Sequence, residues 1–224
     1  MIAYNKNTKK VVAPYWLRSL ILTSFYSGMR LGEIINLRRG QVFLNQRMIF
    51  LSGTDTKEGR PKRVPIHKDL VPILERAMRI TSLEHDHVFL LTDRRGVRPI
   101  TKNCVQLAMR RLNKALNPSS RFHFHDFRHT WRANCSRSGI SDRIAERIMG
   151  HSDSEGYLDG DLPVNRRYGE ISDEELIQAI DRLTFDHGDS RINGRPVILK
   201  SVSWVLAKGQ FSEERALDTN TETL

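Results

Sequence analysis

The chain has 224 residues, a formal net charge of +10 and an isoelectric point of about 9.9. This length suits one substantial domain, and no stretch approaches the roughly eighteen apolar residues of a membrane span. The first residues also lack the apolar run of a signal peptide. We therefore expect a soluble intracellular protein whose positive charge indicates a polyanionic partner, nucleic acid first and an anionic membrane surface second.

The predicted elements of the N-terminal half follow from apolar periodicity and from turn residues. In chain order they are a basic lead-in or linker over 1–12, a helix over 16–27, a short helix over 32–37, a hairpin over 41–51, a glycine-rich turn over 52–60 and a third strand over 63–66. Pro65 favours a sheet edge for that last strand. This small antiparallel sheet is the only β-structure that the pattern predicts.

The C-terminal half is predicted to be helical, with helices over 68–80, 101–116, 125–138, 141–149 and 172–183. A short buried run at 88–91 and an exposed turn at 93–96 separate the first two. After about residue 186 the periodicity fades, so we expect a tail that is partly docked or disordered. The fold class is therefore mainly α with a small antiparallel sheet (α+β), in one domain over 13–185 followed by a tail over 186–224.

The stretch from Phe122 to Trp131 is the richest in functional side chains. If it is helical, residues three and four apart share a face, so His125, Arg128 and His129 form one polar stripe. A fixed arginine flanked by imidazoles suits an anion better than a metal ion, because a guanidinium stays charged. A second, aromatic stripe can anchor the helix in a core: Phe124, Phe127 and Trp131.

Another charged motif lies between two glycines. In Gly28-Met29-Arg30-Leu31-Gly32-Glu33 an arginine is followed three residues later by a carboxylate. Glycine lets backbone approach closely, and Glu33 is suited either to hold Arg30 or to cap the short helix that follows. This pattern gains meaning only together with the histidine and arginine stripe and with Gly150-His151.

Taken together, these motifs resemble the catalytic domain of the tyrosine recombinases, the phage integrase family. The matching segments occur in family order over about residues 13–183: Gly28–Glu33, Thr56–Arg60 leading to Arg63–Ile66, His125–Thr130, Met149–Ser152 and Arg167–Gly169. No segment is specific alone, whereas the ordered set is. The resemblance implies the integrase catalytic core fold and a site-specific recombinase that cleaves and rejoins DNA without a metal, a cofactor or ATP.

The resemblance also implies a mechanism. Arg30 and Arg128 would bind the non-bridging oxygens of one DNA phosphate, whose charge must be stabilised in the transition state. Tyr168 would attack the phosphorus and form a 3′-phosphotyrosine, which retains the energy of the cleaved linkage. An unperturbed phenol has a pKa of about 10, so the surrounding cations would favour the phenolate, with His125 as the acid/base partner.

Two further residues complete the implied site. Lys57, on the glycine-rich turn over 52–60, would donate a proton to the departing 5′-oxygen, and the nearby Lys62 is its rival for that role. His151 would hydrogen-bond the phosphate and help to position the nucleophile. His129 is expected to pack or brace rather than to touch phosphate.

The chain departs from the family pattern in two places. The usual offset from His151 to the nucleophile falls on Gly160. We assign Tyr168 rather than Tyr157 as the nucleophile, because Tyr168 directly precedes the last predicted helix. Only a short segment precedes Pro14, where relatives carry a helical domain that clamps the duplex. We therefore expect either a truncated catalytic domain or a minimal recombinase.

A zinc site is the first alternative, because His125 and His129 have the i, i+4 spacing of helical zinc ligands. Asp126 replaces the glutamate of the usual protease motif, and Arg128 would repel a cation, so we expect no metal. The cysteines do not form a pair with zinc-ligand spacing and are expected to be buried free thiols: Cys104 and Cys135.

The implied partner is double-stranded DNA, bound by a homotetramer during strand exchange, with a monomer possible in the free protein. Candidate contacts to the DNA backbone are Arg60, Lys102 and Arg110. The expected location is the cytoplasm, at the nucleoid or on a phage or mobile element in a host cell. There are two alternatives: a catalytically impaired DNA-binding fragment that lacks its N-terminal clamp domain, and relaxation of supercoils as by a type IB topoisomerase, which needs the same residues.

Overall fold

The computed structural model describes residues 15–80, 82, 84–115, 121–150 and 171–183, together with the backbone of short strands within 3–12 and 191–196. The helices are α1 Tyr15–Ser27, α2 Leu31–Ile35, α3 Val71–Ala77, α4 Lys102–Ala115, α5 Phe124–Arg137, α6 Asp142–Met149 and α8 Asp173–Asp181. The strands are β1 Ala3–Asn5, β2 Lys10–Val12, β3 Val42–Phe43, β4 Met48–Leu51, β5 Lys62–Pro65, β6 Leu90–Asp93, β7 Gly96–Pro99, β8 Arg191–Ile192 and β9 Arg195–Pro196. The predicted class, mainly α with a small antiparallel sheet, is confirmed.

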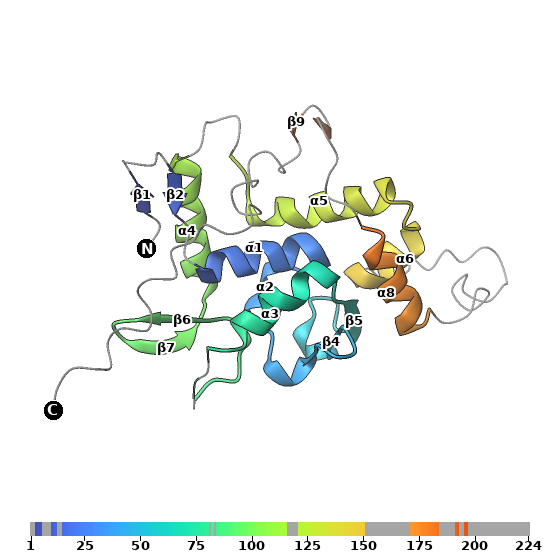
Figure 1. Cartoon of the computed structure of the whole chain (residues 1–224), viewed down its shortest axis with the longest axis horizontal. Helices are drawn as coiled ribbons and strands as arrows, with labels where there is room; N and C mark the ends of the chain where they lie inside the picture. Colours follow the sequence, from blue (N-terminus) through green and yellow to red (C-terminus); the bar gives the residue numbers. More distant parts are fainter. Residues whose placement is uncertain are drawn as a thin grey trace.

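Helices α1 and α5 form the centre of the molecule and pack against each other along their length (Figure 1). The aromatic stripe predicted on α5 is buried, with Phe127 and Trp131 fully inaccessible to solvent and Phe124 9% exposed. Burial of each such ring stabilises the fold by about 2–3 kcal/mol. Nine of the thirteen residues of α1 are buried as well, and this helix pair is the scaffold that carries the charged motifs.

The predicted three-stranded sheet is present, with strand order β3-β4-β5 and antiparallel pairing throughout. Met48 pairs with Pro65, and Ile49 pairs with Val64. Pro65 lies on an edge strand, as predicted, where its missing N–H leaves no ladder bond unmade. Helices α6 and α8 both pack against β5, at the end of the α1–α5 pair away from α4 (Figure 1).

The prediction of a single small sheet was wrong. Strands β6 and β7 form a second antiparallel hairpin, in which Leu90 pairs with Pro99 and Asp93 pairs with Gly96. Asp93 holds its turn by accepting hydrogen bonds from the Arg95 amide at 2.8 Å and from Arg98 at 2.6 Å. Two further strand pairs, β1–β2 and β8–β9, lie in the segments predicted as lead-in and tail.

The last described helix, α8, is capped and anchored to the sheet. Ser172 and Glu175 are three residues apart, the spacing that predicts a capping box. The box is present, because Ser172 Oγ accepts from the Glu175 amide and Glu175 accepts from the Ser172 amide. Arg63 on β5 donates to the Ile171 carbonyl at 3.0 Å and forms an ion pair with Asp173 at 3.0 Å. The chain just before α8 is therefore fastened to the sheet. Among the described residues, no helix is both long and apolar enough to cross a membrane.

Candidate active site

Gly28 brings the end of α1 against α5. It has a φ of +66°, and a Cβ atom built there would lie 2.7 Å from two carbon atoms of the Trp131 ring. A side chain at this position is therefore excluded both by the left-handed backbone and by the ring. The close approach predicted for this glycine is confirmed, and it places the start of α2 beside the polar residues of α5.

Arg30 and Glu33 form one unit at the start of α2. Glu33 accepts from the Arg30 amide at 3.0 Å and from Arg30 Nη1 at 3.2 Å, so it caps the helix and holds the guanidinium. Both alternatives predicted for Glu33 are therefore correct. The Arg30 side chain remains 21% exposed, whereas that of Glu33 is 3% exposed. The guanidinium thus lies at the mouth of the site, above a buried carboxylate.

Lys62 is the second partner of the Glu33 carboxylate. Its Nζ donates to Glu33 Oε2 at 2.7 Å, and its side chain is 1% exposed. Burial lowers the pKa of Lys62 to about 8, against the opposing attraction of Glu33. A Cβ atom built on Gly150 would lie 2.9 Å from Lys62 Cδ, so the end of α6 packs directly on the lysine stem. Sequence reasoning considered Lys62 only as a proton donor and did not foresee this buried position.

Arg128 lies deeper than predicted. Its guanidinium is bonded to two backbone carbonyls, those of Gly28 and of Met149 at 3.0 Å, and the residue is 2% exposed. Burial, reinforced by the nearby charge of Arg30, lowers the pKa of Arg128 to about 10. It stays protonated at neutral pH and joins the end of α1 to the end of α6.

His125 and His129 are exposed on α5, one turn apart, and their rings meet edge to face with centroids 4.6 Å apart. Partial desolvation of the ring, with the charges of His129, Arg128 and Arg30, lowers the pKa of His125. A neutral imidazole beside two arginines is suited to accept a proton. In the described part of the chain, no three His, Cys, Asp or Glu side chains gather as metal ligands would.

The turn between β4 and β5 brings a carboxylate to the site. Glu58 forks onto Arg30, with Nη1 to Oε2 at 2.9 Å and Nη2 to Oε1 at 2.5 Å. Its neighbour Lys57, the predicted proton donor, is exposed. Sequence reasoning missed Glu58, although its place beside Lys57 in the matching segment was the available signal.

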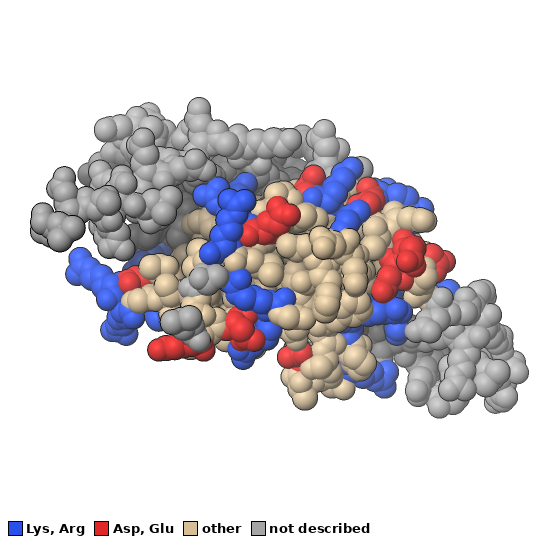
Figure 2. All heavy atoms as spheres, turned by 60° about the horizontal axis from the view of Figure 1, so that its bottom comes forward, with Lys and Arg blue, Asp and Glu red and all other residues tan. Residues whose placement is uncertain are grey.

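Some predicted residues are separate from this cluster or lie outside the described residues. His151 follows Gly150 directly, and Tyr168 precedes Ile171 by three residues, but neither is within the described ranges, and nor is Tyr157. The predicted DNA contacts all have exposed side chains: Arg60, Lys102 and Arg110. Figure 2 shows one face of the molecule, where Lys and Arg side chains lie around the rim and the centre is mostly uncharged.

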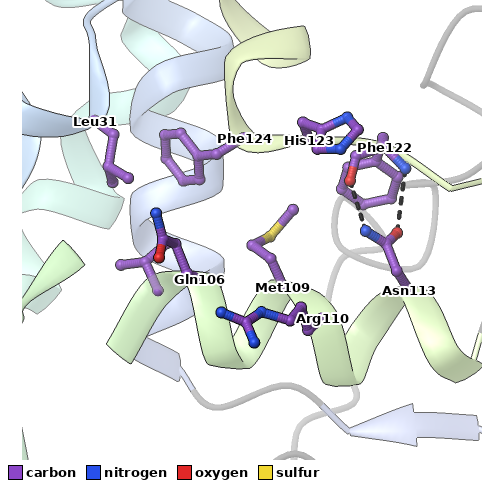
Figure 3. Close-up of a pocket in the computed structure, with 9 residues that line it drawn as sticks. Leu31, Gln106, Met109, Arg110, Asn113, Phe122, His123 and Phe124 are labelled. Atoms are coloured by element: carbon purple, nitrogen blue, oxygen red, sulfur yellow. Dashed lines mark hydrogen bonds between the residues drawn. The ribbon is translucent and has the colours of Figure 1, made fainter. Parts of the chain in front are cut away.

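An apolar cavity of about 500 Å³ lies between α4, the start of α2 and the segment that leads into α5. Leu31, the residue after Arg30, and Phe124 form one wall, and Met109 on α4 faces them (Figure 3). The Asn113 amide closes one end by bonding both the N–H and the carbonyl of Phe122, at 3.1 and 2.7 Å. This cavity therefore borders the arginine cluster on its apolar side.

Comparison with known proteins agrees with this geometry. Residues 2–156 match the phage integrase family, and the chain belongs to that family. It is 22% identical over 166 residues to a tyrosine recombinase of Thermosipho africanus, covering 74% of this chain and 53% of the relative. It is 26% identical over 167 residues to tyrosine recombinase XerA of Thermococcus kodakarensis, covering 72% of this chain and 53% of the relative.

A solved structure supports the fold. The integrase from mycobacterium phage Brujita matches with a TM-score of 0.54 and 19% identity, over 83% of this chain and 56% of that one. The integrase catalytic core fold predicted from the ordered motifs is thus confirmed. The chain spans about half the length of the curated relatives that it matches.

Proposed function

We propose that this chain is the catalytic part of a site-specific recombinase that cuts and rejoins duplex DNA through a 3′-phosphotyrosine. The observation that carries the proposal is the convergence of Arg30 and Arg128 from segments far apart in the chain. Arg128 donates to the carbonyl of Gly28, two residues before Arg30, and His125 lies on the same helix as Arg128. Two guanidiniums with a neutral imidazole beside them are suited to a phosphodiester, because they stabilise the charge of its non-bridging oxygens.

The proposed reaction has two balanced steps. The Tyr168 oxygen attacks phosphorus, its proton passes to His125, and the bond from phosphorus to the 5′-oxygen breaks. That oxygen takes its proton from Lys57, and His151 steadies the phosphate. A 5′-hydroxyl of the partner strand then attacks the phosphotyrosine and gives its proton to the neutral Lys57 amine. The bond from phosphorus to the Tyr168 oxygen breaks, and that oxygen takes back its proton from His125.

Lys57 remains our proposed proton donor, and Lys62 receives a different role. An ammonium that is 1% exposed and bonded to Glu33 is held away from solvent and is engaged with the carboxylate that holds Arg30. We assign Lys62 to holding Glu33. Lys57, on an exposed turn, has the freedom to approach a bound phosphate.

The proposed partner is double-stranded DNA inside a cell, at the nucleoid or on a phage or mobile element, with four copies of the chain assembled during strand exchange. The exposed Arg60, Lys102 and Arg110 are the proposed backbone contacts. Neutralising each of them should weaken binding to all sequences alike and reduce its salt dependence.

The test is formation of a covalent protein–DNA adduct. The chain is incubated with a pool of random-sequence duplexes carrying 5′-bridging phosphorothiolates, which trap the cleaved state, and the adduct is detected in denaturant. We expect an adduct that disappears with Tyr168→Phe and persists with Tyr157→Phe. An adduct that survives Tyr168→Phe would overturn the nucleophile assignment, and DNA binding without any adduct would favour the impaired, binding-only alternative.

A further inference from the structure

The contact between Arg30 and Glu58 occupies the part of the site that faces solvent. The two oxygens of Glu58 meet the two terminal nitrogens of Arg30 at 2.5 and 2.9 Å, a fork in which each oxygen has its own nitrogen. A guanidinium binds a phosphate through the same paired geometry. The two side chains are 21% and 23% exposed, so the fork lies where a DNA backbone would reach Arg30.

Glu58 and Glu33 hold Arg30 in different ways. Glu33 is buried, and it is also bonded to the Arg30 amide and to Lys62, so it is fixed by the fold. Among the described residues, Arg30 is the side chain found hydrogen-bonded to the Glu58 carboxylate, whose charge also attracts the buried Arg128. A phosphate can therefore displace Glu58 while Glu33 keeps the guanidinium in place.

We propose that Glu58 is an internal competitor for the scissile phosphate, occupying the Arg30 fork in the DNA-free chain and leaving it when DNA binds. This proposal rests on the proposed function, because it takes Arg30 as a phosphate ligand. It goes beyond that function because it gives the site a closed state, in which the Glu58 carboxylate occupies the place on Arg30 that the DNA phosphate would take.

The turn that carries Glu58 is braced within itself. Thr56 Oγ1 donates to the Arg60 carbonyl at 2.7 Å, and a Cβ atom built on Gly53 would lie 2.6 Å from the Gly59 carbonyl oxygen. Release of Glu58 therefore frees a compact turn rather than a loose chain. Lys57 is on the same turn, so a phosphate that replaces Glu58 at Arg30 arrives beside the turn that carries the proposed proton donor.

The test separates the contact from net charge. Glu58→Gln removes the charge, Glu58→Asp keeps the charge but is one methylene too short for the fork, and Glu75→Gln on the exposed part of α3 is the control for charge alone. Affinity for a fluorescent random-sequence duplex is measured by anisotropy. We expect Glu58→Gln to bind roughly three- to tenfold more tightly than wild type, since a partly exposed ion pair no longer competes.

Glu58→Asp should also bind more tightly than wild type, although its charge is unchanged. Glu75→Gln should change the affinity by less than about twofold. In an Arg30→Gln background, Glu58→Gln should no longer increase the DNA affinity, because the guanidinium for which Glu58 and phosphate compete is absent. Melting curves of each variant confirm that the chain is folded.

The proposal that Glu58 competes with phosphate is contradicted if the DNA affinity of Glu58→Gln is equal to or weaker than that of Glu75→Gln. A gain that persists in the Arg30→Gln background contradicts it as well. The adduct assay distinguishes this failure from that of the proposed function. If wild type forms the Tyr168 adduct and Glu58→Gln forms it no faster and binds no tighter, only the competitor is wrong. If no adduct forms at all, the proposed function fails first.

Discussion

Arg128 and Arg30 present the same guanidinium at the same candidate site, in opposite kinds of surroundings. Arg128 is 2% exposed and bonded to the carbonyls of Gly28 and Met149, which are parts of the backbone itself. Arg30 is held at the surface by two carboxylates. Backbone carbonyls cannot leave without unfolding the chain, whereas a side-chain carboxylate can. The site thus combines a fixed cation with an adjustable one.

Conservative replacement of either arginine should have the largest effect. Arg128→Lys should reduce adduct formation by about 10³-fold, because an ammonium cannot fork onto two phosphate oxygens. Arg30→Lys should slow adduct formation similarly. The two variants should differ in thermal stability, with Arg128→Lys melting lower because both carbonyl bonds are weakened. An Arg128→Lys variant within about tenfold of the wild-type rate would contradict the role of this residue.

The buried ion pair offers a second test. Lys62→Met should lower the free energy of unfolding by about 3 kcal/mol, because it leaves the Glu33 charge buried without its main partner. Asp86→Asn breaks an ion pair with Arg38 that is exposed, and it should leave the stability unchanged within error. Denaturant titration of both variants measures this. Equal effects from the two changes would show that the Lys62 contact is not the internal support described above.

Glycine substitutions test the close approach of α1 to α5. Gly28→Ala should destabilise the chain by about 2 kcal/mol, because the added Cβ meets the Trp131 ring and the φ is positive. Gly32→Ala is the matched control, since nothing lies within 4 Å of its added Cβ. The control should be neutral or slightly stabilising, because alanine favours helix. Thermal melting of the two variants measures this difference. Equal melting temperatures would contradict the close contact between position 28 and the Trp131 ring.

The smallest expected effect is on the pH dependence of stability. Burial lowers the pKa of His67 and of His125 in the folded chain. The unfolded chain binds these protons from about pH 6.5, the folded chain only at lower pH, so stability is complete above 6.5 and is lost as the pH falls toward the folded values. Melting should occur at a lower temperature at about pH 5.5 than at about pH 7.5.

Changing one histidine isolates its contribution. His67→Asn should reduce the difference in melting temperature between the two pH values. His123→Asn is the matched control, because that side chain is 92% exposed. An unchanged pH dependence in His67→Asn would mean that the lowered pKa of His67 does not contribute to the acid sensitivity.

Local pattern was sufficient to predict much of the fold. The aromatic stripe of α5, the capping box of α8 and the β3-β4-β5 sheet all depend on residues close in sequence, and each is present. The β6–β7 hairpin was missed because β7 is Gly-Val-Arg-Pro, with no alternation of apolar residues. Its strand is defined by pairing with β6 rather than by its own composition.

In the candidate site too, contacts between residues close in sequence were predicted and contacts between distant residues were not. The roles of Glu33 follow from a spacing of three residues and were predicted. The contacts of Glu58 and Lys62 join residues 28 and 29 positions apart, so they depend on how the β4–β5 turn folds back onto α2. The assignments of His151 and Tyr168 concern residues outside the described ranges and remain predictions.

The most direct measurement is to identify the residue that carries the DNA. The trapped adduct is digested with protease and nuclease, and mass spectrometry locates the modified peptide and the linkage. We predict a nucleotide joined through its 3′-phosphate to Tyr168. Attachment to Tyr157, to another residue, or through a 5′-phosphate would contradict the convergence of these groups around one phosphate with Tyr168 as its nucleophile.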